Sequence, residues 1–143
     1  MDLTAGLLAA LALVALATLV GVIGRARTGR VRDASGAGIA DALGLPADSL
    51  GGRATLVQFS TEFCSRCPGT ADRLRELAAG YRDVTHVEID LTGDPVLADR
   101  FHVTQTPTTL VLDATGSQVA RIGGVPRQPD LRDLLDHLTG SIR

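Results

Sequence analysis

The only two cysteines of the chain are Cys64 and Cys67, with Ser65 and Arg66 between them. They follow an apolar run over residues 54–59, which is typical of a buried strand, and they precede apolar residues at helical spacing. At the start of a helix, unpaired N–H groups favour the thiolate of the first cysteine, and the second cysteine lies one turn away. The spacing therefore predicts a pair of sulfurs that opens and closes a disulfide.

The cysteine pair has two alternative interpretations. A purely structural disulfide would close a loop so short that little chain entropy is removed. Half of a zinc or iron–sulfur site would need two more ligands, which only a second copy of the chain could supply. The sequence has no other cluster of His and Cys with metal-binding spacing. We therefore expect no metal and no cofactor beyond the redox-active disulfide Cys64–Cys67.

An apolar segment at residues 3–24 carries no charge and consists almost wholly of Leu, Ala, Val, Ile and Gly. As a helix it would span roughly the hydrocarbon core of a bilayer, at a rise of about 1.5 Å per residue. A cleavable signal peptide is the alternative, but it would have basic residues before a shorter apolar core and small residues at a cleavage site. The segment predicts a transmembrane anchor.

Basic residues follow this segment and none precedes it; they are Arg25, Arg27, Arg30 and Arg32. Because arginines gather on the cytoplasmic side of a membrane, the sequence predicts a single-pass protein of the cell membrane with a cytoplasmic catalytic domain. An outward-facing domain would usually carry its charges before the apolar run. We expect an anchor at 1–24, a basic juxtamembrane linker at 25–38 and a folded domain at 39–143.

The charge of the folded part is acidic. The four arginines are four of 14 basic residues, and Asp2 is one of 16 acidic residues, so residues 33–143 carry 10 basic and 15 acidic side chains, a net charge of −5. This balance lacks the basic surface that binds phosphate backbones, and we expect no nucleic-acid partner.

The pattern of apolar, turn and capping residues predicts alternating strands and helices. Residues 39–50 predict a short helix or a loop. We expect strands at 54–60, 84–90, 108–113 and 117–122, and helices at about 64–80, from Asp94-Pro95 onward, and from residue 128 to a stop at Gly140. This order indicates one α/β domain, with a mixed sheet of four or five strands and helices on both faces.

This order of elements, with the cysteine pair at the start of the first helix, resembles the thioredoxin family. The resemblance covers about residues 53–138 and rests on two segments, Phe-Ser-Thr-Glu-Phe-Cys-Ser-Arg-Cys at 59–67 and Val-Thr-Gln-Thr-Pro-Thr at 103–108. The second segment matches the family pattern of a small or β-branched residue, proline and threonine. The resemblance implies a thioredoxin fold and a protein-disulfide oxidoreductase.

The resemblance also implies roles for particular residues. Cys64 would attack a substrate disulfide, and the more buried Cys67 would resolve the mixed disulfide. Ser65 and Arg66 would tune the redox potential, although a solvated Arg66 is the simpler alternative.

Thr106 and Pro107 would form the substrate-binding edge opposite the sulfurs, with Pro107 in the place of the family's cis-proline. Backbone groups of Thr106 could pair with an extended substrate segment. The alternative is a proline that merely starts the strand at residue 108.

Several residues depart from the family pattern. Phe63 replaces the tryptophan that normally precedes the first cysteine, and Gln58 replaces a buried aspartate that shuttles the proton of the second cysteine. Gln58 cannot titrate, so either His86 or Glu88 on the next strand substitutes for it, or these two side chains simply lie on the surface. Pro68 directly follows Cys67 and disfavours helical geometry there.

Taken together, these features predict an enzyme that reduces protein disulfides or persulfides and is itself reduced by a thiol electron donor. One alternative is an outward-facing oxidoreductase for secreted proteins or cytochrome maturation. Another is a non-catalytic binding module that uses the groove at Thr106 and Pro107.

Overall fold

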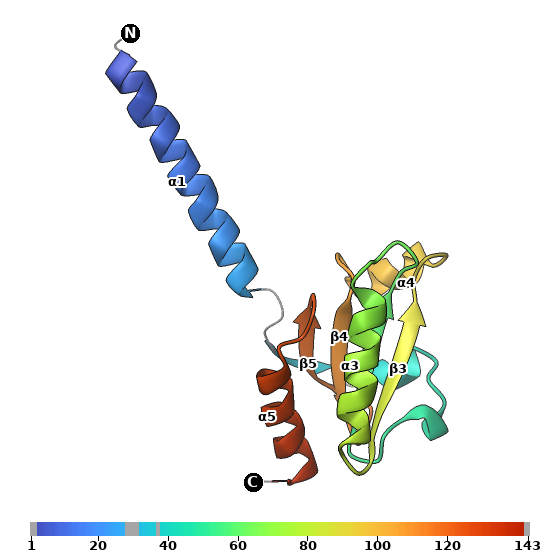
Figure 1. The fold of residues 1–143 in the computed structure, drawn as a ribbon. Coiled ribbons are helices and arrows are strands. Elements are labelled where there is room, and N and C mark those ends of the chain that lie inside the picture. Colours follow the sequence, from blue (N-terminus) through green and yellow to red (C-terminus); the bar gives the residue numbers. More distant parts are fainter. Residues whose placement is uncertain (1–2, 28–31, 37, 142–143) are drawn as a thin grey trace.

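The structure, a computed structural model, describes residues 3–27, 32–36 and 38–141. An apolar helix precedes an α/β domain, and the two are drawn in Figure 1. In chain order the elements are α1 (Leu3–Arg27), β1 (Arg32–Gly36), α2 (Ile39–Ala42), the 3-10 helix η1 (Ala47–Ser49), β2 (Ala54–Ser60), α3 (Cys67–Ala79), β3 (Val84–Asp90), α4 (Pro95–Arg100), β4 (Thr108–Asp113), β5 (Gln118–Gly123) and α5 (Gln128–Thr139).

The strands form one mixed sheet in the order β1-β5-β4-β2-β3. β2 pairs with β3 in parallel and with β4 antiparallel, and β5 pairs antiparallel with both β4 and β1. All seven residues of β2 are buried, as expected for a central strand without alternating polar positions. The mixed α/β sheet predicted from the sequence is thus confirmed, and it has five strands.

Helices cover both faces of the sheet, as the sequence predicted. The face under α3 and α5 is a cluster of aliphatic side chains: Ala54, Leu56, Leu74, Leu77, Ala78, Val111, Ala120, Ile122, Leu131 and Leu135. The opposite face packs against α2 and α4 through Ala40, Val57, Phe59, Leu91, Phe101, Leu110 and Leu112. Phe59 of β2 and Phe101 at the end of α4 pack with ring centroids 5.8 Å apart.

Local signals predicted most element bounds. β2, β3 and β4 have the predicted bounds, whereas β5 begins one residue later than expected. Asp94 caps α4, since its carboxylate accepts a hydrogen bond from the Leu97 N–H at 2.8 Å. Gly140 ends α5 with a φ of 69°, in the left-handed region that favours glycine.

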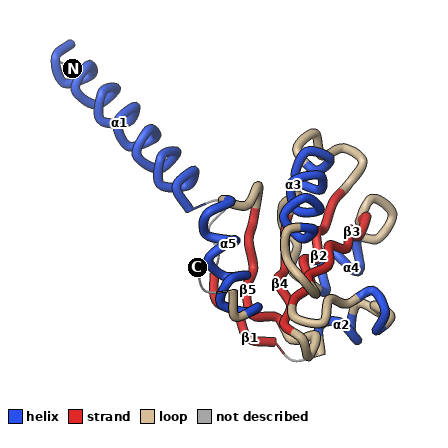
Figure 2. Tube along the Cα trace, turned by 60° about the horizontal axis from the view of Figure 1, so that its bottom comes forward, coloured by secondary structure: helices blue, strands red, loops and turns tan. Residues whose placement is uncertain are grey.

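β1 falls inside the stretch that composition predicts to be a linker. Arg32 and Asp33 pair with Arg121 and Ala120 of β5, so this strand adds an edge to the sheet beside β5 (Figure 2). Its sequence, Arg-Asp-Ala-Ser-Gly, has no alternation of apolar and polar residues. The residue pattern therefore does not predict this strand, because the strand forms by pairing with the edge of β5.

α1 is long and apolar enough to cross a membrane. Its segment Gly6–Gly24 has 19 residues and a mean hydropathy of 2.6, and none of it is buried within the structure. A signal sequence near the N-terminus can meet the same criteria of length and hydropathy, so this finding by itself establishes one candidate span.

Candidate active site

The two cysteines lie where the chain leaves the central strand and enters α3. Cys64 and Cys67 are joined by a disulfide, with their Cα atoms 5.4 Å apart. Cys64 is partly exposed, whereas Cys67 is 2% exposed. One sulfur of the pair is therefore open to a partner and the other is shielded by the fold.

The helix that follows the cysteines starts later than the sequence predicted. We expected it to begin at about Cys64, but α3 begins at Cys67. Proline has no N–H, so it must lie among the first residues of a helix, whose N–H groups have no intrahelical partner. Pro68 meets this condition only if the helix starts just before it. Cys64 therefore lies in the turn ahead of α3, and its carbonyl accepts a hydrogen bond from the Cys67 N–H at 3.1 Å.

Ser65 and Arg66, the two residues between the cysteines, are exposed. The Arg66 carbonyl accepts hydrogen bonds from the N–H and the hydroxyl of Thr70, at 3.1 and 2.9 Å. These bonds order the first turn of α3, while both side chains at 65 and 66 remain on the surface beside the disulfide.

The loop before β4 lies against the segment that carries the cysteines. The Thr106–Pro107 peptide bond is cis. The hydroxyls of Thr106 and Thr61 are 3.4 Å apart, and the buried Pro107 accepts a hydrogen bond from the Gly124 N–H at 2.7 Å. The structure thus brings together the two sequence segments on which the family resemblance rests.

A pocket of about 440 Å³ opens beside the disulfide. It is lined by Ser60, Thr61, Glu62, Cys64, Cys67, Pro68, Glu88 and Asp90. The hydroxyl and N–H of Thr92 donate hydrogen bonds to Asp90 and lower the pKa of its carboxyl group. A larger cavity of about 630 Å³ lies around Tyr81 and Asp136, where α3 ends, and does not include the cysteines.

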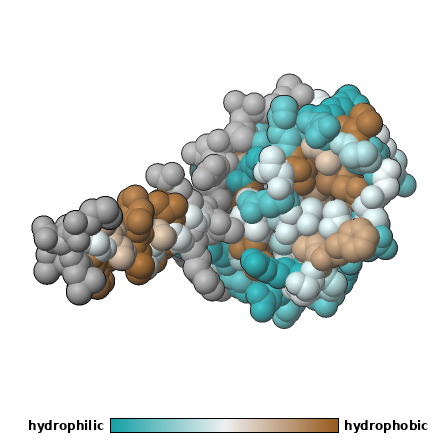
Figure 3. All heavy atoms as spheres, turned by 90° about the horizontal axis from the view of Figure 1, so that it is seen from above, coloured by the Kyte–Doolittle hydropathy of each residue, from teal (hydrophilic) through white to brown (hydrophobic). Residues whose placement is uncertain are grey.

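Apolar side chains are also exposed on this face of the domain. Figure 3 views the domain from above, the direction in which β3 points in Figure 1, and shows apolar groups among polar ones. Phe63, directly before Cys64, is 84% exposed. Phe63 therefore lies on the surface next to the accessible sulfur.

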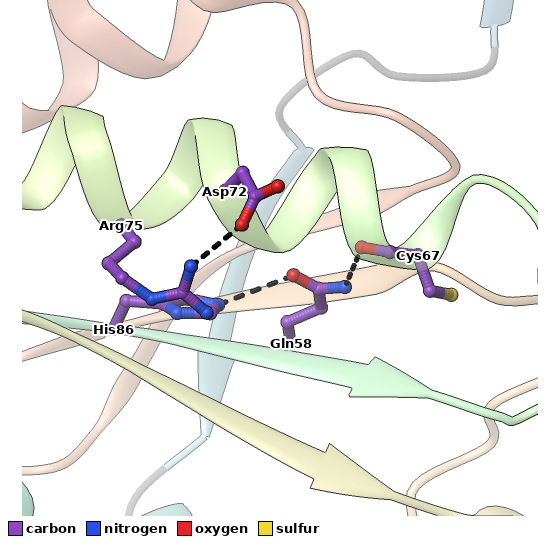
Figure 4. Close-up of polar contacts among 5 residues, drawn as sticks. All are labelled: Gln58, Cys67, Asp72, Arg75 and His86. Carbon is purple, nitrogen blue, oxygen red and sulfur yellow. Dashed lines mark hydrogen bonds and ion pairs between the residues drawn. The ribbon is translucent and has the colours of Figure 1, made fainter.

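Beneath the start of α3, a buried amide contacts the backbone of the second cysteine. Gln58 is 0% exposed, and its Nε2 donates a hydrogen bond to the Cys67 carbonyl at 3.1 Å. Its Oε1 lies 3.3 Å from Nε2 of His86 (Figure 4). The Cys67 sulfur points away from this amide in the same view. The position where the sequence places a glutamine instead of an aspartate is therefore in contact with Cys67, through its peptide group.

His86 is not the surface residue that the strand pattern suggested. It is half-buried, with the Arg75 guanidinium beside it in Figure 4. Burial, and secondarily the charge of Arg75, lower the pKa of His86, while Glu88 opposes this shift.

In the parallel ladder His86 pairs with Leu56, so it is the diagonal neighbour of Gln58 on the same face of the sheet. From the sequence alone, this diagonal relation was the feature that could have predicted the contact between His86 and Gln58. Glu88, which pairs with Gln58, is exposed.

The lowered pKa of His86 predicts an acid-dependent loss of stability. The unfolded chain takes up this proton near pH 6.5, whereas the folded protein takes it up only at lower pH, so stability falls as pH decreases through that interval. The measurement is the free energy of unfolding in urea between pH 7.5 and 5, with His86→Gln as the control, which should flatten the dependence. Asp90 and Asp113, whose pKa values are also lowered, contribute only at more acidic pH. An equal slope for both proteins would contradict the assignment to His86.

Among the described residues, no group of three or more His, Cys, Asp or Glu side chains could hold a metal ion.

Comparison with known proteins identifies relatives of the domain. The family model named thioredoxin matches residues 50–137. A thioredoxin of Chlamydia trachomatis is 32% identical over 89 residues, which is 62% of this chain and 86% of that protein. Thioredoxin C-3 of Corynebacterium nephridii is 31% identical over 81 residues, which is 57% of this chain and 55% of that protein. The structure of Fasciola hepatica thioredoxin superposes with a TM-score of 0.55 at 24% identity, covering 69% of this chain and 92% of that one.

Proposed function

Because the chain belongs to the thioredoxin family and is a thiol–disulfide oxidoreductase of that type, we propose that Cys64 and Cys67 are its catalytic residues and that it reduces protein disulfides or persulfides. The observation that carries this assignment is the Cys64–Cys67 disulfide, with one partly exposed cysteine and one buried cysteine.

The proposed reaction moves two electrons from the dithiol to the substrate. The Cys64 thiolate attacks one sulfur of a substrate disulfide, which forms a mixed disulfide and releases the other sulfur as a thiolate. The Cys67 thiolate then attacks Cys64, which forms the intramolecular disulfide and releases the second substrate thiolate. With a persulfide, the first attack is on the outer sulfur, and the second releases hydrogen sulfide. A thiol electron donor returns the enzyme to the dithiol form.

The loop before β4 is proposed as the substrate-binding edge. Thr106 is partly exposed, and its hydroxyl lies 3.4 Å from that of Thr61, in the turn that leads to Cys64. Its backbone N–H and C=O form no hydrogen bond within the described residues, which leaves them free to pair with an extended substrate segment. Pro107, the next residue of the proposed edge, is buried. Ser65 and Arg66 are the proposed redox-tuning residues, since both are exposed beside the sulfurs.

An insulin-reduction assay tests the proposed function. With dithiothreitol as the electron donor, the protein should accelerate the precipitation of insulin chains over the reductant alone. The control is the same protein alkylated after reduction, in which both thiols are blocked. A rate equal to that of the alkylated control would overturn the proposal in favour of a binding module.

We further propose that residues 3–24 anchor the protein in the cell membrane, and that the domain at 39–143 faces the cytoplasm. The support is the apolar α1 and the four arginines that follow its apolar part. In this arrangement residues 25–38 connect the span to the domain, and β1 within them ties the connection to the sheet edge.

An export-dependent phosphatase fused after Arg143 should be silent in a bacterial host, because the arginines that follow the span disfavour translocation. A matched fusion, with the four arginines changed to glutamine and Asp2→Arg, should gain phosphatase activity because the basic residue then precedes the span. Strong activity from the unmodified fusion would reverse the proposed orientation and support the outward-facing alternative.

A further inference from the structure

We propose that His86 is a positioning residue for the resolving cysteine: by donating its Nε2–H to Gln58, it fixes the buried amide that holds the Cys67 peptide. This inference rests on the proposed function, since it concerns the step in which Cys67 attacks the mixed disulfide. It begins from the chain of contacts drawn in Figure 4, which runs from His86 through Gln58 to the Cys67 carbonyl.

The direction of each hydrogen bond follows from the Cys67 carbonyl. A carbonyl oxygen can only accept, so the group of Gln58 that faces it at 3.1 Å must be the NH₂ group. The amide oxygen of Gln58 then faces His86 at 3.3 Å, and an oxygen without hydrogen can also only accept. His86 must therefore carry a proton on Nε2. In the neutral ring this leaves Nδ1 unprotonated, so the contacts select one of two tautomers.

Because Gln58 is buried, the loss of the His86 donor would have an energetic cost. The Gln58 side chain is fully buried, and within the described chain it makes two hydrogen bonds, to Cys67 and to His86. A buried amide oxygen without a donor is unfavourable, so loss of the His86 donor would favour other orientations of the amide. Thr109, the β4 partner of Gln58, does not share this bond in the structure, since its buried hydroxyl has no hydrogen-bond partner in the described residues.

The backbone N–H and the backbone C=O of Cys67 both form hydrogen bonds. Its N–H donates to the Cys64 carbonyl at 3.1 Å, and its own carbonyl accepts from Gln58 at 3.1 Å. Resolution requires the Cys67 sulfur to meet the Cys64 sulfur in line with the bond that breaks, and small displacements of a reacting group lower such rates strongly. The first attack, by Cys64 on substrate, does not involve Cys67. The proposal therefore predicts an effect on the second step alone.

The test is a single-turnover reaction of the reduced protein with 5,5′-dithiobis(2-nitrobenzoate). Attack by Cys64 releases one nitrothiobenzoate ion, and resolution by Cys67 releases a second, so the two steps appear as two phases of absorbance. In His86→Leu, which has no donor, the second phase should slow roughly tenfold, with the first phase unchanged. In His86→Gln, whose amide N–H can replace Nε2–H, the second phase should be restored.

Equal second phases in all three proteins would overturn the proposal, as would a parallel slowing of both phases, which indicates a purely structural role. A second measurement uses the unmodified protein and does not depend on variant folding. The ¹⁵N shifts of the His86 ring at neutral pH should show a proton on Nε2, and a proton on Nδ1 alone would overturn the proposal. Absence of both phases in the unmodified protein would instead overturn the proposed function, while the ring shifts would still report on the Gln58–His86 contact.

Discussion

Replacing Cys64 by serine should reduce the insulin-reduction rate to the background of the chemical reductant, whereas replacing Cys67 by serine should trap substrates as mixed disulfides. A serine hydroxyl does not attack a disulfide, so Cys64→Ser loses the first step. Cys67→Ser retains the partly exposed nucleophile but has no second thiol to release the substrate. On a non-reducing gel, the Cys67→Ser protein should therefore run as a larger, disulfide-linked complex with its substrate, and dithiothreitol should reduce this complex to its components.

The double variant Cys64→Ser/Cys67→Ser is the control for trapping. It has no thiol and should form no complex, which separates covalent capture from simple adhesion to the exposed Phe63. Reduction of insulin by Cys67→Ser at the normal rate would show that the two-cysteine mechanism is wrong. Complex formation by Cys64→Ser, through Cys67, would instead reverse the roles assigned from exposure.

Replacing Gln58 by aspartate should destabilise the protein by about 3–5 kcal/mol at pH 8, the typical penalty of a buried charge without compensation. The side chain is 0% exposed and faces the Cys67 carbonyl, which repels a carboxylate. This is a large part of the roughly 5–15 kcal/mol by which domains are usually stable.

Gln58→Asn is the matched control, because it has the same shortened side chain without the charge. It should destabilise the protein by about 1–3 kcal/mol, the usual effect of leaving buried polar groups unpaired. A buried carboxyl group has its pKa raised in the folded state, so the deficit of the aspartate variant relative to asparagine should grow as pH rises above about 4. Urea unfolding at pH 4.5 and pH 8 measures this difference. Equal stabilities of the two variants at both pH values would show that position 58 admits water.

The sequence by itself determined the elements whose signals are local. The apolar run over residues 54–59 predicts β2, the Asp94-Pro95 pair marks the start of α4, and Gly140 marks the end of α5. These signals depend on side-chain patterns and capping within a few residues of one another, so they can be interpreted without the rest of the fold. The cysteine pair belongs to this group, because its spacing and its place between a strand and a helix are both local.

Tertiary structure alone decided the features that depend on neighbours distant in sequence. β1 forms because the edge of β5 offers backbone partners to a segment whose own pattern predicts none. The start of α3 at Cys67, by contrast, follows from the adjacent Pro68, which has no N–H and must lie in the first turn of a helix.

The contact between Gln58 and His86 also arises from the tertiary structure. It exists because the parallel register places residues 28 apart on the same face of the sheet, and because α3 covers that face and brings the Cys67 carbonyl over Gln58. A sequence specifies which side chains can donate or accept hydrogen bonds. Which of them meet in the interior depends on strand register and helix packing, since burial removes water as the competing partner.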